Sequence, residues 1–134
     1  MRCLSMPITY QIDRAKQLVR TSCTGTTTLD EVLQHFAVLI QDPECPERLN
    51  VLLDLSEMIS LPASEQLRTV ATEIARIGPR VQFLNCTIIA PKDAMFGMAR
   101  MFEVFAEQHF GATRVFRTRD EGAIWLESPT VPLE

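Results

Sequence analysis

Residues 91–126 read PKDAMFGMAR MFEVFAEQHF GATRVFRTRD EGAIWL, and this stretch decides the expected fold. It contains the end of a strand, a long Met- and Phe-rich helix over 94–110, a short strand over 114–118 and a closing helix that ends near Leu126. An amphipathic helix set between two strands is typical of a β-sheet covered by helices. No recognisable catalytic motif falls within the stretch.

The first part of the chain predicts a hairpin followed by a helix. Apolar and polar residues alternate over 8–12, and a polar turn over 13–16 separates this run from a second expected strand over 17–23, which indicates an antiparallel hairpin. Thr28 and Glu31 have the spacing of a capping box, which begins a helix, and Asp42-Pro43 ends it. The apolar stripe of this helix consists of Leu29, Val32, Leu33, Phe36 and Ile40.

A central strand is expected over 51–55. This run, VLLDL, is apolar apart from one carboxylate, and such a pattern suits a strand that is covered on both faces. Pro62 is placed to start the next helix, with Ser64 as a second candidate cap, and Gly78-Pro79 ends that helix. A further strand is expected over 81–90.

The expected elements follow the order β-β-α-β-α-β-α-β-α. This order predicts an α/β fold with a mixed, mostly parallel sheet of five strands covered by about four helices. The 134 residues fit a single domain, with an ordered core over 7–127 and a frayed tail over 128–134.

Composition and charge argue against several functional classes. Thirteen basic and seventeen acidic residues give a net charge of -4 without a basic run, so nucleic acid is not an expected partner. The longest apolar runs have strand length, far below the ~20 residues of a membrane span, and the N-terminus lacks a signal-peptide pattern. We therefore expect a soluble cytoplasmic protein in which the cysteines stay reduced: Cys3, Cys23, Cys45 and Cys86. Their spacing predicts no metal site, two histidines and five glycines are few for a metal or nucleotide site, and no cofactor is expected.

The chain resembles the SpoIIAA-like proteins of the wider STAS group (sulfate transporter and anti-sigma-factor antagonist). The segments that carry the resemblance are Ile8-Thr9-Tyr10, Val51-Leu52-Leu53-Asp54-Leu55, Phe96-Gly97-Met98-Ala99-Arg100-Met101-Phe102-Glu103, Val115-Phe116-Arg117 and Ala123-Ile124-Trp125-Leu126. The resemblance implies the mixed, mostly parallel sheet and a family largely without assigned activity. Some members are grouped with lipid-binding Sec14-like domains, a grouping that rests on sheet architecture alone.

The best-known regulation in this group is phosphorylation of a serine at the start of the helix after the central strand. The family pattern is roughly Asp-Leu-Ser, a short hydrophobic turn and then Asp-Ser-Ser-Gly, and counting from Asp54 places Ser64 at the phosphorylated position. Here Pro62-Ala63 replaces the preceding Asp-Ser, and Glu65 replaces the Gly and would repel an added phosphate. Ser64 is therefore a phosphorylation candidate whose expected role is helix capping.

Three further polar residues have structural interpretations. Asp54, at the end of an apolar strand, is expected to accept loop N–H bonds and fix the strand-to-helix turn. His35 falls opposite the apolar stripe and is expected to be solvated, whereas His109 lies near a helix end, where a core or capping role is favoured. An enzymatic function would need Asp54, His109 and Arg100 in one pocket, which the expected helix faces argue against.

The Met- and Phe-rich helix carries more apolar surface than one contact with a sheet requires. Its expected core residues are Met98, Phe102 and Phe105. Phe96 and Met101 fall off that stripe and are candidate interface or ligand-binding residues. Arg100 lies on the polar side, where an ion pair with Glu103 is expected and anion binding is the alternative.

Two functions follow as hypotheses. The first is a non-enzymatic regulatory or scaffolding module that acts through a protein partner, including a second copy in a homodimer. The second is a carrier or sensor of a small apolar or lipid-like ligand, held between the Met- and Phe-rich helix and the sheet. The second hypothesis requires an internal cavity, and a tightly filled core would exclude it.

Overall fold

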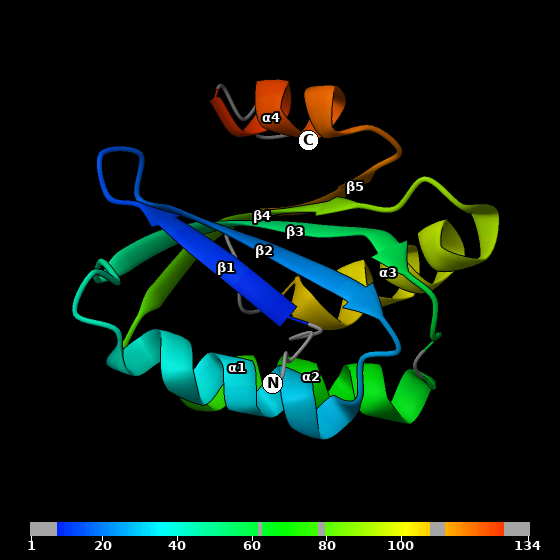
Figure 1. The fold of residues 1–134 in the computed structure, drawn as a ribbon, viewed down its shortest axis with the longest axis horizontal. Helices are drawn as coiled ribbons and strands as arrows, with labels where there is room; N and C mark the ends of the chain where they lie inside the picture. The colour runs from blue at the N-terminus through cyan, green and yellow to red at the C-terminus, as the bar shows by residue number, and fades with distance from the viewer. Residues whose placement is uncertain (1–7, 62, 78–79, 108–111, 128–134) are drawn as a thin grey trace, which may run out of the picture.

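A computed structural model describes residues 8–61, 63–77, 80–107 and 112–127. One sheet of five strands has the spatial order β1-β2-β3-β4-β5 (Figure 1). The strands are β1 (Ile8–Asp13), β2 (Leu18–Gly25), β3 (Arg48–Met58), β4 (Gln82–Ile89) and β5 (Ala112–Phe116). β1 pairs with β2 in an antiparallel hairpin, and every other pairing is parallel. The predicted mixed, mostly parallel sheet is therefore confirmed.

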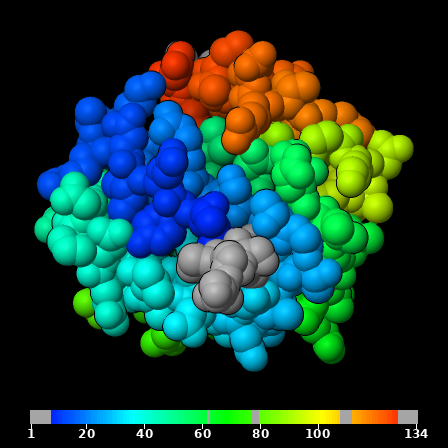
Figure 2. Space-filling model, in the orientation of Figure 1, coloured from blue at the N-terminus to red at the C-terminus, as the bar shows by residue number. Residues whose placement is uncertain are grey.

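The helices cover the two faces of the sheet unequally. They are α1 (Leu29–Gln41), α2 (Ser64–Ile77), α3 (Asp93–Ala106) and α4 (Arg119–Glu127), which confirms the predicted order of elements. α1, α2 and α3 lie on one face, and α4 alone lies on the other (Figure 1). In the space-filling view, α4 forms a separate ridge above the β1–β2 hairpin, and α1 lies below the hairpin (Figure 2). Within the described ranges, no helix combines the length and apolar character needed to cross a bilayer.

Local hydrogen bonds start two of the helices, each at a Thr and a Glu that have the spacing of a capping box in the sequence. The Thr28 hydroxyl accepts from the Glu31 amide at 3.2 Å, and the Glu31 carboxylate accepts from the Thr28 amide at 2.8 Å, which completes the capping box of α1. At the start of α4, the Thr118 hydroxyl accepts from the Glu121 amide at 3.2 Å. These bonds satisfy amides that the first helical turn leaves without a partner.

The start of α2 differs from the prediction. Ser64 is the first helical residue and is exposed, so it is not the capping residue. The Gln66 side chain accepts from the Ala63 amide at 2.9 Å, and the Ala63 carbonyl accepts from the Leu67 amide at 3.2 Å. The helix thus begins one residue earlier than a Ser64 cap requires, with Ala63 in the capping position and Gln66 supplying the side-chain bond. Pro62, the other predicted start, lies outside the described residues.

Several other boundaries also shift, and β3 spans 48–58 instead of the expected 51–55. α3 ends at Ala106, four residues before its predicted end. The sequence did not indicate this end, because no helix-breaking residue occurs between Ala106 and Gly111. β5 occupies 112–116 instead of 114–118, because residues 117 and 118 form the bend that leads into α4. The predictions for Cys3, Gly78-Pro79, His109 and the tail over 128–134 concern positions outside the described residues.

Both faces of β3 are covered, which confirms it as the central strand. Leu52 packs on the α4 side with Leu18 and Ile89, and this smaller cluster extends to Phe116 and Leu126. Alternate side chains such as Leu55 join the main core under α1, α2 and α3. The main core lies on the face that carries three helices, and the space described below lies within it.

Candidate functional site

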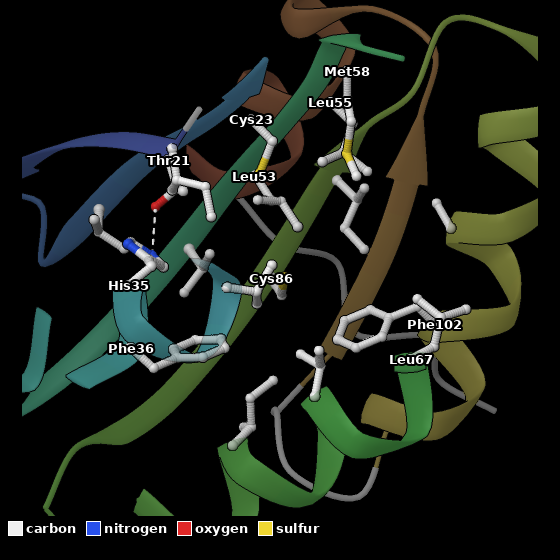
Figure 3. A pocket seen from close by; sticks show the side chains of 18 of the residues that line it. Thr21, Cys23, His35, Phe36, Leu53, Leu55, Met58, Leu67, Cys86 and Phe102 are labelled. Carbon is white, nitrogen blue, oxygen red and sulfur yellow. Dashed lines mark hydrogen bonds between the residues drawn. The ribbon is translucent and has the colours of Figure 1, made fainter. Parts of the chain in front are cut away.

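A cavity of about 120 Å³ lies between the three-helix layer and the sheet (Figure 3). Its wall combines side chains from β1 to β4 with side chains from α1, α2 and α3. The residues labelled in Figure 3 are Thr21, Cys23, His35, Phe36, Leu53, Leu55, Met58, Leu67, Cys86 and Phe102. All three helices of the layer line the cavity, and α3 contributes Met98, Ala99 and Phe102. The internal space that the ligand-carrier hypothesis requires is therefore present.

Short side chains on three neighbouring strands explain why this space exists. Five helix-facing positions carry residues smaller than Leu: Val19, Thr21 and Cys23 of β2, Val51 of β3 and Cys86 of β4. Larger side chains nearby hold the helices away from the sheet, so short side chains leave space beneath them. As a result, Val51 and Leu53 are only half-buried, although they lie in the central strand.

α1 forms one wall of the cavity. Its predicted apolar stripe faces inward, and Val32 and Phe36 line the space. Yet Leu39 is the one residue of this fully described helix that is buried, and the stripe itself is only half-buried. The helix therefore gains less packing than its apolar surface could provide, because part of that surface faces the cavity.

His35 lies inside this wall, so the prediction that it is solvated is wrong. It is three residues after Val32 and four before Leu39, and it therefore shares the inward face of α1 with both. Its Nε2 atom lies 3.5 Å from the Thr21 hydroxyl oxygen (Figure 3), and its ring packs against Tyr10 with centroids 5.5 Å apart. Burial lowers the pKa of His35 to about 4, so the imidazole is neutral near pH 7.

Two thiols also face the cavity. Burial raises the pKa of the Cys23 thiol and the Cys86 thiol to about 12, with nearby carboxylates adding to the effect. Both therefore remain protonated near pH 7 and are poor nucleophiles. Within the part of the chain that the structure describes, the residues that line the cavity include no Asp, Glu, Lys or Arg. This chemistry suits the binding of a neutral apolar molecule.

On the opposite face of the sheet, Asp54 lies within β3. Its Oδ1 atom accepts from the Ser56 amide at 2.9 Å and from the Ser56 hydroxyl at 2.5 Å. Because Ser56 also belongs to β3, which continues to Met58, the prediction of a bond to a loop N–H that fixes the strand-to-helix turn is wrong. Its Oδ2 atom accepts from Arg119 Nε of α4 at 2.8 Å, a contact across 65 residues that the sequence did not predict. Burial alone would raise the pKa of Asp54, but the bonds from Ser56 and Arg119 outweigh it and the pKa is lowered.

The candidate residues of α3 have different environments. Met101 is 44% exposed, and Val104, one turn further, is 66% exposed. Phe96 is half-buried against the core, with the Arg117 guanidinium 4.3 Å from its ring centroid. Arg100 pairs with Glu103 at 3.0 Å, which confirms the predicted ion pair.

Asp54 and Arg100, two residues of the enzymatic hypothesis, are not brought together. Arg100 lines a second, more polar pocket with Glu103 of α3, three residues of β5 and Trp125 of α4, and Asp54 is not among the residues of that pocket. Phe102 is buried, and Met98 and Phe105 pack against the same core, as predicted. In the ranges that the structure describes, no three His, Cys, Asp or Glu side chains are grouped as metal ligands would be. Ser64 stays a phosphorylation prediction.

A comparison with solved structures identifies the fold. The chain is similar to an uncharacterised protein of the DUF3478 family with a SpoIIAA-like fold, from Shewanella loihica PV-4. The TM-score is 0.61 at 18% sequence identity, over 94% of this chain and 98% of that chain. This chain therefore has a SpoIIAA-like fold, as the resemblance in its sequence implied. No protein-family model and no curated protein matches the sequence.

Proposed function

We propose that this protein is a non-enzymatic carrier or sensor that holds a small apolar molecule between its sheet and its three-helix layer. The observation that carries the proposal is the cavity of about 120 Å³, whose wall is built from apolar side chains. Ligand sites are typically concave and mostly apolar, with few polar groups, and this space has that character.

The size of the cavity supports the proposal. Protein interiors have few voids larger than a water molecule. At roughly 24 cal/mol per Å³, an empty space of about 120 Å³ forgoes about 3 kcal/mol of packing stability. A ligand that fits would recover part of this free energy through burial and dispersion contacts.

The polar content of the wall favours an apolar occupant over water. A buried water normally needs two to four polar partners. Among the lining residues that the structure describes, Thr21 and His35 supply the only polar side chains apart from the thiols, and the Thr21 hydroxyl lies 3.5 Å from the His35 ring. An occupant without polar groups leaves that contact intact and adds no unsatisfied atom.

The same wall supports a function without catalysis. Its thiols are protonated, its imidazole is neutral, and its described lining residues contain no carboxylate. A nucleophile or general base needs an activating partner within hydrogen-bond reach. Binding accounts for these residues without assigning them a reaction.

Benzene provides a direct test because it is small and uncharged. We expect benzene titration to shift the amide resonances of residues around the cavity in a saturable manner. Ala99→Leu, which extends a lining side chain into the space, should weaken binding by at least about tenfold. Ala123→Leu, on the exposed surface of α4, makes the same substitution outside the cavity and should leave binding unchanged.

A second cavity-filling variant provides the same test if Ala99→Leu does not fold. Val70→Leu adds a single methylene to another lining residue and should also weaken binding. Folding of each variant is checked by thermal unfolding. Absence of saturable shifts in the wild-type protein, or equal shifts in both filling variants, would contradict the proposal.

The exposed apolar pair on α3 favours a second candidate function, a regulatory module that acts by protein contact, including homodimerisation. Met101 and Val104 are neighbours on the helix surface and are 44% and 66% exposed. If this pair mediates self-association, Met101→Glu combined with Val104→Glu should give a monomer in sedimentation velocity. Val38→Glu changes an exposed apolar residue of α1 and is the matched control. Sedimentation of the wild-type protein as a monomer would exclude homodimerisation through α3.

A further inference from the structure

The cavity wall is rich in sulfur atoms and phenyl rings. Four of its 21 lining residues contain sulfur, against ten of 134 in the whole chain. They are Cys23, Met58, Cys86 and Met98, and the phenyl rings are those of Phe36, Phe83 and Phe102. Figure 3 shows Cys23, Met58 and Cys86 on the sheet side of the space, with Phe36 and Phe102 among the side chains across from them. An occupant would therefore contact both kinds of group.

Sulfur atoms and phenyl rings interact more favourably with an aromatic ligand than with a saturated one. A divalent sulfur near the edge of an aromatic ring is attracted to it, and phenyl rings favour edge-to-face contact with another ring. A saturated molecule of the same size gains only the general contribution of apolar burial. The wall thus offers an aromatic ligand interactions that an alkane cannot use.

The volume of the cavity and the uncharged character of its lining narrow the range of possible ligands further. An engineered cavity of about 150 Å³ in another protein binds benzene. At about 120 Å³, this cavity has room for one ring and is too small to enclose a long acyl chain. Among the described residues of the lining there is no Asp, Glu, Lys or Arg to pair with an ionised ligand, so a charged group would lose its hydration without compensation from them.

From these features we infer that the ligand class of this cavity is a neutral molecule with a single aromatic ring, held by sulfur and phenyl contacts. The inference rests on the proposed ligand-binding function and specifies its ligand. It also separates this site from one for a lipid-like chain, the broader possibility that the sequence left open.

The test compares benzene with cyclopentane, a saturated ring of similar size. The association constant of each compound is measured by calorimetric titration of the full chain. Each association constant is then divided by the partition coefficient of that compound from water into an alkane. This division removes the difference in general hydrophobicity. We expect the normalised affinity for benzene to exceed that for cyclopentane by about threefold or more, within the two- to tenfold range of a sulfur–aromatic contact.

Substitution of sulfur tests the cause of the preference. Met58→Leu combined with Met98→Leu nearly conserves side-chain volume and removes two lining sulfur atoms. This double variant should reduce the ratio of the normalised benzene affinity to the normalised cyclopentane affinity by about twofold or more. Met95→Leu is the matched control, since Met95 is a buried methionine of α3 outside the cavity wall. The single variants Met58→Leu and Met98→Leu are measured as well, so that the test still gives a result if the double variant does not fold.

The outcomes separate this inference from the proposed function. Binding of both rings with a normalised ratio of one or less would overturn the aromatic ligand class and leave the carrier proposal standing. A preference that persists unchanged in the sulfur variants would overturn the sulfur contacts as its cause. Binding of neither ring, to a protein shown to be folded, would overturn the proposed function itself.

Discussion

The Nε2 atom of His35 lies 3.5 Å from the hydroxyl oxygen of Thr21, which brings α1 against β2 at the wall of the cavity. The contact places a titratable ring inside an otherwise apolar layer. Its distance is long for a hydrogen bond, so burial rather than this contact dominates the environment of the imidazole.

This burial predicts that stability falls as the solution is acidified. The folded-state pKa of His35 is about 4, below its ordinary value of 6.5, so the unfolded chain binds more protons between these values. The His35 contribution is fully present above pH 6.5 and is lost as the pH falls toward 4. Between about pH 7.5 and pH 5, the expected loss is about 2 kcal/mol in the free energy of unfolding.

Urea unfolding of the wild-type protein and His35→Leu at both pH values measures this contribution. Other groups titrate in the same window, so the relevant quantity is the difference between the two proteins. The wild-type protein should lose about 2 kcal/mol more than the variant. Parallel losses would show that His35 is not the buried neutral group described here.

Two helical glycines should respond in opposite directions to the same substitution. At Gly97 an added Cβ meets no atom within 4 Å, so Gly97→Ala should stabilise α3 by about 1 kcal/mol through helix propensity. At Gly122 an added Cβ would lie 2.5 Å from Thr87 Cγ2 and 2.6 Å from Ile89 Cδ1. Gly122→Ala should therefore destabilise the protein by about 1 kcal/mol, since steric strain exceeds the propensity gain.

Urea midpoints of the two variants decide this prediction. Each glycine variant serves as the control for the other, because both replace a helical glycine with alanine. Stabilisation by both substitutions would mean that α4 packs less closely on β4 than the contact distances at Gly122 indicate.

The ion pair between Asp54 and Arg119 should contribute modestly to stability. Asp54 has a side chain only 7% exposed, whereas the Arg119 side chain is 70% exposed, so solvent screens much of the attraction. Arg119→Ala should cost about 1 kcal/mol, because it removes a charge-assisted hydrogen bond from a buried carboxylate. Arg14→Ala breaks an exposed contact of 3.8 Å with Glu44 and should cost close to nothing. Equal losses in urea unfolding would contradict this ranking.

Local signals in the sequence predicted most of the architecture. The capping pairs at Thr28 and Thr118 fix where two helices begin, and the apolar run at 51–55 indicates a strand covered on both faces. These features depend on neighbouring residues, so the sequence pattern is sufficient. The bond from Arg119 to Asp54 joins residues 65 positions apart, and periodicity carries no information about it.

The sequence placed the hypothetical cavity only under α3 and did not predict the part under α1 and α2, for a related reason. Its space arises from small residues on separate strands, among them Val19, Val51 and Cys86, which become neighbours only when the sheet forms. The sequence predicted a solvated His35 because the inward face of α1 is broader than the apolar stripe that ends at Ile40. A run of small residues at helix-facing strand positions is the signal that could have indicated the space.

The crystal structure of the protein soaked with benzene tests the central claim most directly. The account predicts ring-shaped electron density between the sheet and α1–α3, bounded by Phe36, Cys86 and Phe102. A core closed by rearranged side chains, with no density there and no benzene bound in solution, would contradict it.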